Sequence, residues 1–112
     1  MDNISIGHRL WLNKDEKFFL GLGRVALLKA IEDHGSISAA ARSMNMSYKK
    51  AWQAIDAMNS LSDEPLVIRT TGGSGGGGTK VTEAGHQAVE LYDRINSSCN
   101  QFLDNHLKSN RP

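Results

Sequence analysis

A chain of 112 residues with 39% hydrophobic and 22% charged residues has the composition of one soluble globular domain with a modest core. Its formal net charge is +1, so the overall balance neither indicates nor excludes a polyanionic partner. The sequence contains no apolar run near the ~20 residues of a membrane span, no secretion signal, and one cysteine, Cys99, which cannot form an internal disulfide. We therefore expect a cytoplasmic protein without a membrane partner.

The first third of the chain predicts a small β-hairpin followed by a helix. Loosely alternating apolar residues at 4–12 precede a polar turn at 13–16, and the second strand is expected at 17–20. Apolar residues at helical spacing then predict a helix from 23 to 34. Gly35 suits the left-handed position that closes a helix.

Residues 35–61 predict two short helices joined by a tight turn at Asn45, a residue that tolerates the left-handed region. Ser36 and Ser47 are the expected N-caps of these helices. The first helix has one apolar face, formed by Ile37, Ala40, Ala41 and Met44. The second has a buried stripe formed by Ala51, Ile55 and Met58. Outside this stripe lie polar or large side chains, as on a recognition helix: Tyr48, Lys49, Lys50, Gln53 and, at its border, Trp52.

Two lysines, Lys49 and Lys50, open the second of these helices, where the macrodipole and the free N–H groups are already positive. Cations are favourable at this end when an anion binds there, so the pair indicates a phosphate site. The alternative is a pair of solvated surface lysines. No acid occurs from 34 to 55 or from 65 to 82, although five cations do: Arg42, Lys49, Lys50, Arg69 and Lys80. This distribution predicts a basic face, the electrostatic footprint of DNA binding.

Residues 66–70 and 79–82 predict two strands of a wing whose tip is almost pure glycine. A tip without side chains can lie close to a phosphate backbone and offer bare N–H groups. The alternative is a loop that contacts nothing. The same glycines match dinucleotide and P-loop spacings, but a strand follows them instead of a helix, so nucleotide binding is not expected.

From Thr82 the sequence predicts a long helix with an apolar seam, which we expect to form the interface of a homodimer. The expected interface residues are Ala84, Ala88, Leu91, Tyr92, Ile95, Ser98, Cys99 and Phe102. The chain is accordingly divided into a DNA-binding domain at 1–82 and a dimerisation helix with a frayed tail at 83–112.

Catalytic and metal-binding patterns are not found in the sequence. The four histidines are scattered without ligand spacing, and Cys99 lies on the apolar side of the last helix, where a packed thiol is expected. No enzyme, metal or cofactor is therefore predicted.

Residues 25–92 resemble the winged helix-turn-helix domain of the molybdate-dependent regulator ModE family, itself similar to the DNA-binding domain of LysR-type regulators. The motifs that carry the resemblance are SYK-x-AW at 47–52, TGG-x-GGGG at 71–78, Gly35–Ser38, Met58–Asn59, and Thr82 with Gly85. The resemblance implies a mainly α fold with small β and a dimeric transcription regulator. Its recognition helix, residues 47–61, would enter the major groove beside a wing at 66–82.

The residues expected to contact double-stranded DNA lie on both helices and on the wing: Ser36, Ser38, Ser47, Tyr48, Lys49, Lys50, Gln53, Arg69, Gly75, Gly76 and Lys80. Lysines and arginine are assigned to phosphates, and Tyr48 and Gln53 to base edges or positioning; Lys49 or Lys50 could instead reach guanine. A two-fold dimer predicts a palindromic operator.

Members of the family carry a C-terminal oxyanion-binding region, whereas this chain stops at Pro112. We therefore expect no molybdate-binding region, and any signal would come from a separate effector or regulator subunit. The competing hypothesis is a winged-helix interaction module that binds another regulator without contacting DNA.

Overall fold

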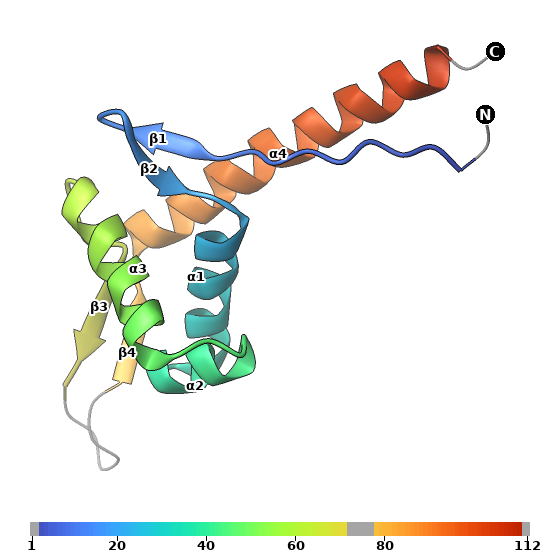
Figure 1. Cartoon of the computed structure of the whole chain (residues 1–112). Helices are drawn as coiled ribbons and strands as arrows, with labels where there is room; N and C mark the ends of the chain where they lie inside the picture. Colours follow the sequence, from blue (N-terminus) through green and yellow to red (C-terminus); the bar gives the residue numbers. More distant parts are fainter. Residues whose placement is uncertain (1–2, 72–77, 111–112) are drawn as a thin grey trace.

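The computed structural model describes residues 3–71 and 78–110. In chain order, the elements are β1 (Leu12–Lys14), β2 (Lys17–Leu20), α1 (Leu22–His34), α2 (Ile37–Ser43), α3 (Tyr48–Leu61), β3 (Val67–Thr70), β4 (Gly78–Val81) and α4 (Glu83–Ser109). The two hairpins, β1–β2 and β3–β4, are separate antiparallel sheets, and α1, α2 and α3 pack beside them (Figure 1). The predicted fold class, a winged helix-turn-helix with an N-terminal hairpin and a long C-terminal helix, is confirmed.

The N-terminal hairpin turns through Asp15 and Glu16, whose φ angles of 52° and 64° both lie in the left-handed region. A two-residue turn with positive φ at both positions matches the twist of paired strands. The hairpin was expected to begin near residue 4, and this extent is wrong. Because β2 offers only four residues for pairing, residues 4–11 belong to neither strand.

The predicted ends of the helices are confirmed at atomic detail. The hydroxyl oxygens of Ser36, Ser47 and Thr82 each accept a hydrogen bond of 3.0–3.1 Å from the backbone N–H three residues later. Gly35 closes α1 with a φ of 72°, and Asn45 makes the turn between α2 and α3 with a φ of 54°. These short-range bonds satisfy helix ends that would otherwise leave unpaired backbone groups.

The core forms around α1, whose Leu27, Leu28 and Ile31 are at most 1% exposed. The predicted stripe of α3 is buried against it, as is the apolar face of α2, apart from half-buried Met44. The remaining buried side chains come from β2, the wing region and α4: Leu20, Leu66, Val67, Val81 and Tyr92. All parts of the fold therefore contribute to one core.

Tyr92 of α4 is 2% exposed, and its hydroxyl donates a hydrogen bond of 3.0 Å to the carbonyl oxygen of Leu10. Its assignment to the dimer interface is therefore wrong, because its side chain is already covered by its own domain. The expected boundary at residue 82 does not separate two packing units either, since the first turns of α4 complete the core.

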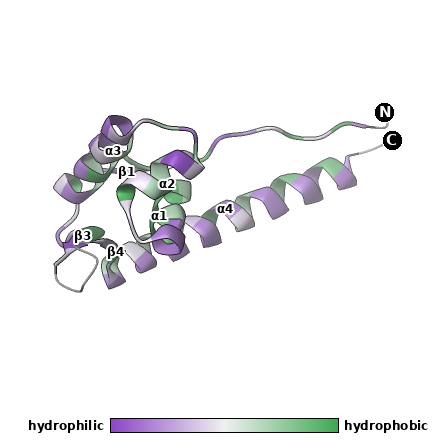
Figure 2. Ribbon diagram, turned by 90° about the horizontal axis from the view of Figure 1, so that it is seen from below, coloured by the Kyte–Doolittle hydropathy of each residue, from purple (hydrophilic) through white to green (hydrophobic). Residues whose placement is uncertain are grey.

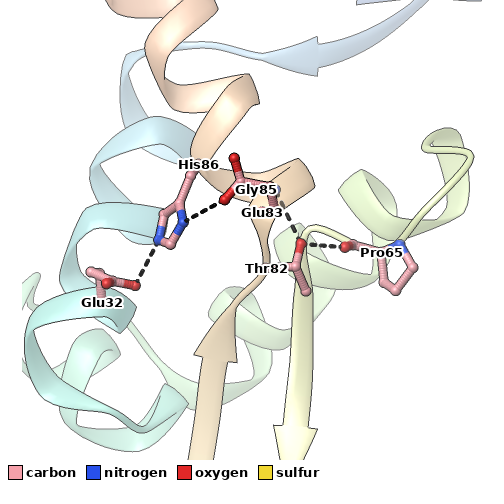
Figure 3. Close-up of polar contacts among 6 residues, drawn as sticks. All are labelled: Glu32, Pro65, Thr82, Glu83, Gly85 and His86. Carbon is pink, nitrogen blue, oxygen red and sulfur yellow. Dashed lines mark hydrogen bonds and ion pairs between the residues drawn. The ribbon is translucent and has the colours of Figure 1, made fainter.

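The junction between the wing and α4 is tightly packed (Figure 3). The Thr82 hydroxyl donates to the Pro65 carbonyl oxygen at 2.6 Å while it accepts from the Gly85 N–H. A side chain at Gly85 would collide with the Leu66 carbonyl oxygen and lie 2.6 Å from a methyl group of Val81. Glycine at this position lets α4 begin directly against the wing.

The same junction is joined to α1 through a histidine. His86 Nε2 lies 3.1 Å from the Glu32 carboxylate, and Nδ1 lies 3.9 Å from that of Glu83 (Figure 3). A second link between these helices is the ion pair of Lys29 with Asp93, at 3.0 Å.

Beyond these contacts, α4 projects away from the other helices and both hairpins, with the N-terminal segment running beside it (Figure 1), and the chain measures 63 × 29 × 21 Å. Hydrophobic and hydrophilic residues alternate along this projecting part (Figure 2). Its large exposed apolar side chains are Leu91, Ile95 and Phe102, at 44%, 39% and 62% exposure. None of the described helices combines the length and apolarity that crossing a bilayer requires.

Replacement of Gly85 by alanine is expected to lower the free energy of unfolding by about 1 to 3 kcal/mol, because the new methyl group overpacks the wing junction. Urea unfolding followed by circular dichroism measures the change. The matched control is Gly23→Ala in α1, where nothing lies within 4 Å of the added methyl group. That variant should be as stable as the parent or more stable, and an equal loss in both variants would contradict the packing argument.

Candidate nucleic-acid interface

The side of α3 that faces away from the core carries Lys49 and Gln53. Successive residues of an α-helix turn by about 100°, and the buried stripe of Ala51, Ile55 and Met58 fixes which side faces inward. Lys49 and Gln53 lie opposite this stripe, and both are exposed. A partner that approaches α3 from solvent therefore meets these two side chains first.

The two flanks of α3 differ. Tyr48 and Trp52 lie on the flank that faces the wing, whereas Lys50 lies on the other flank, about 100° from Lys49. The ion pairs within residues 3–71 and 78–110 use Lys14, Lys29 and His86, so neither Lys49 nor Lys50 is paired with a carboxylate there. Both lysines thus remain available to an external anion, as the phosphate hypothesis requires.

The wing reaches α3 through Arg69. Its guanidinium donates a hydrogen bond of 3.3 Å to the Tyr48 hydroxyl, which joins residues 21 positions apart in the chain. Arg69, Tyr48, Lys49 and Trp52 together line a shallow surface depression. The fold therefore brings a wing cation into the same cluster as the first turn of α3.

The wing is also held against the turn between α1 and α2. The Thr79 N–H donates to the Gly35 carbonyl oxygen at 2.9 Å. Gly78 has no room for a side chain here, since its Cβ would lie 2.9 Å from the same oxygen. The resulting groove is lined by residues of α2, α3 and the wing, including Ser36, Ser38, Tyr48 and Arg69. Ser36 and Ser38, which were both predicted to contact DNA, thus border the α3 cluster.

Lys80 is not part of that cluster. In the wing, Arg69 pairs with Thr79 and Lys80 pairs with Ile68. Because side chains alternate between the two faces of a hairpin, Arg69 and Lys80 point to opposite faces. Gly75 and Gly76, which were also expected to contact DNA, lie outside the described residues.

Asn59, near the end of α3, is a positioning residue that the sequence reasoning quoted only as part of a motif. Its Oδ1 accepts hydrogen bonds from the backbone N–H groups of Leu66 and Val67 at 2.8 and 3.3 Å. Its Nδ2 donates to the Val67 carbonyl oxygen at 3.0 Å. One amide thus pairs with the backbone at the start of β3 and sets the wing relative to α3. The available signal was a polar residue directly beside the buried Met58.

Together, the buried α1–α3 core, the outward cations of α3 and the attached β-hairpin define a winged helix-turn-helix protein. Residues 22–86 match the family of bacterial regulatory helix-turn-helix proteins of the lysR type, and the chain belongs to this family.

The chain is also similar to ModE proteins, which confirms the resemblance drawn from the motifs. It is 45% identical over 96 residues to the molybdenum transport protein ModE of Azotobacter vinelandii, covering 86% of this chain and 36% of that protein. It is 48% identical over 86 residues to the DNA-binding transcriptional dual regulator ModE of Escherichia coli K12, covering 77% and 33%. The chain therefore spans about a third of the length of these relatives.

The fold itself is shared with a solved protein–DNA complex. The crystal structure of the CbnR_DBD-DNA complex superposes with a TM-score of 0.59 at 21% sequence identity, covering 80% of this chain and 97% of that one.

Replacement of Asn59 by alanine is expected to lower the free energy of unfolding by about 1 to 3 kcal/mol, because three backbone groups at the start of β3 lose their partner. Amide chemical shifts should change along β3 and β4. Asn105→Ala, at an exposed position of α4, is the matched control and should leave both measurements unchanged. Unchanged β3 and β4 shifts in the Asn59 variant would contradict the positioning role.

Proposed function

We propose that this chain is a transcriptional regulator that binds double-stranded DNA sequence-specifically as a homodimer in the cytoplasm. The observation that carries the proposal is the exposed first turn of α3, whose two lysines make no ion pair within the described residues and which lies beside the wing cation Arg69. A helix N-terminus with added cations favours phosphates. The similarity to the ModE protein of Escherichia coli, a DNA-binding transcriptional regulator, supports the same function.

In this proposal α3 lies in the major groove with its outward side toward the bases. Gln53 is then placed to hydrogen-bond a base edge, and Lys49, on the same side, can reach guanine or a phosphate. Lys50 on one flank and Arg69 on the other are placed to contact the two phosphate backbones that border the groove. One acid, Asp56, lies on this outward side of α3 itself, two turns after Lys49, and would restrict where phosphates can approach.

The other predicted contacts extend this footprint. Ser36, Ser38 and Ser47 would donate from the α2 and α3 ends to phosphates, although the Ser36 and Ser47 oxygens also cap their own helices. The wing contacts, including Lys80, would follow the adjacent backbone.

The homodimer would form through α4. Leu91, Ile95 and Phe102 expose apolar surface on one side of the helix, with Ser98 and half-buried Cys99 beside them. Ala84 and Ala88 pack partly against their own core and would lie at the edge of the interface. Isologous pairing of two such helices relates two α3 helices by a dyad, so the operator would be palindromic with half-sites ~34 to 36 Å, or a multiple, apart. Control by a separate effector or regulator subunit stays a prediction.

Lys49→Ala and Gln53→Ala test the assignment of α3. If Lys49 contacts a phosphate, its loss should weaken binding to all sequences alike. It should also reduce the slope of log binding constant against log salt concentration (the salt slope) by about 1 for each protomer. If Gln53 reads a base, its loss should cost about 1 to 3 kcal/mol and relax one operator position. Electrophoretic mobility shifts at several salt concentrations, with selected and random duplexes, measure both effects.

The control for these variants is Lys108→Ala, at the far end of α4, which should change neither affinity nor slope. If both α3 variants lose the same affinity for selected and for random DNA, the assignment of Lys49 to a phosphate and Gln53 to a base is contradicted. Failure of the unmodified protein to bind any duplex at low salt, together with salt-insensitive binding of a protein partner, would instead favour the interaction-module hypothesis.

Ile95→Asp tests the dimer. A carboxylate in the apolar seam should convert the protein to a monomer, because burying an unpaired charge at the interface is costly. Sedimentation velocity gives the mass in solution. The control is Ser97→Asp, on the opposite side of α4, which should remain dimeric; dissociation of both variants would point to a loss of helix stability rather than of an interface.

A further inference from the structure

We propose that Trp52, with Tyr48 one turn before it, reads thymine by packing against the C5-methyl groups of the bound DNA. This inference rests on the proposed function and goes beyond it by naming the base and the group that is recognised. Neither aromatic ring is needed for the core, which the adjacent stripe of Ala51, Ile55 and Met58 fills.

The two rings expose apolar surface beside the cations. Tyr48 is 47% exposed and Trp52 is 41% exposed, and their spacing of four residues places them on the same flank of α3. Trp52 borders two adjoining surface hollows, one shared with Tyr48, Lys49 and Arg69 and the other with the wing. Contiguous exposed aromatic surface of this kind usually marks a binding site.

The surrounding charge indicates what covers these rings. Lys49 and Arg69 border the depression that Trp52 shares with Tyr48, whereas Asp56 borders the second hollow beside Trp52. The partner therefore presents negative charge on the Tyr48 side of the rings, next to an apolar group. In the major groove of DNA, the thymine C5-methyl is the apolar group, and phosphates flank it.

Indole chemistry restricts which base edges Trp52 can recognise: its N–H can donate to an acceptor, and its apolar ring can pack on a thymine methyl. Tryptophan has one N–H donor and no acceptor, so it cannot pair with the amino groups of adenine or cytosine. The Tyr48 hydroxyl already accepts a hydrogen bond from Arg69, which holds its ring on the wing side. Trp52 lies between the outward row of Lys49 and Gln53 and the wing, where it faces the edge of the groove rather than its centre.

The test uses the homodimeric full chain and duplexes selected from a random library by that protein. Each thymine is replaced in turn by deoxyuridine, which lacks the methyl group and keeps every hydrogen-bonding atom. We expect one or two thymines in each half-site at which this replacement weakens binding about fourfold, the value of one buried methyl group. Trp52→Ala should bind the thymine duplex more weakly and lose the sensitivity to deoxyuridine at those positions.

Trp11→Ala provides the matched control, because Trp11 is 53% exposed and lines a different groove, beside the N-terminal segment and α4. This variant should keep the full deoxyuridine effect. Trp52→Ala should also keep the circular dichroism spectrum of the parent protein, which checks that it is folded. Its salt slope on random duplex should equal that of the parent, which checks that its phosphate contacts are intact.

Three results would overturn the inference. If the protein binds selected duplexes but no deoxyuridine replacement weakens binding, methyl readout is wrong while DNA binding stands. Sensitivity that persists in Trp52→Ala would assign the methyl contact to another residue. Failure of the protein to bind any duplex would refute the proposed function, and with it the inference.

Discussion

The position of the wing relative to α3 depends on one side-chain amide. Asn59 pairs with backbone groups of Leu66 and Val67 through both its oxygen and its nitrogen, so the start of β3 is fixed directly to the end of α3. A buried backbone group without a partner is costly, which gives this arrangement few alternatives. Together with the glycine contacts on the opposite side, this attachment sets the direction of β3, from which Arg69 meets Tyr48.

Glycine supports the same geometry from the opposite side. Gly85 and Gly78 sit where a Cβ atom would meet the carbonyl oxygens of Leu66 and Gly35 respectively. Close packing of α4 and of the α1–α2 turn against the hairpin therefore leaves no room for a side chain at either point. The wing is held by contacts to three separate segments, which is how a short two-stranded hairpin can present a cation at a defined place.

The exposed residues of α3 and α4 oppose the local rules of stability. Lysines in the first turn of a helix and aromatic side chains in solvent both disfavour the isolated fold. Such exceptions concentrate at functional sites, where a partner compensates for them. Within α4, side chains that serve the core and side chains left for a partner are neighbours. Tyr92 is buried in its own domain, whereas Leu91, beside it in sequence, is 44% exposed.

The sequence by itself determined the features that depend on near neighbours. These were the caps at Ser36, Ser47 and Thr82, the left-handed residues Gly35 and Asn45, and the buried stripe of α3, because each follows from contacts within about one helical turn. The strand pattern at 66–70 and 79–82 predicted the wing, and the family motifs added its place beside the recognition helix.

Only the tertiary structure decided which of the chosen residues come together. It placed Arg69 beside Tyr48 and turned Lys80 to the other face of the hairpin, a consequence of strand register that composition does not reveal. It also buried Tyr92, which the helical pattern had assigned to a dimer seam, because the side of α4 that covers the core is set by packing against distant segments. A helical repeat identifies an apolar side, but the contacts made by the folded chain determine what covers it.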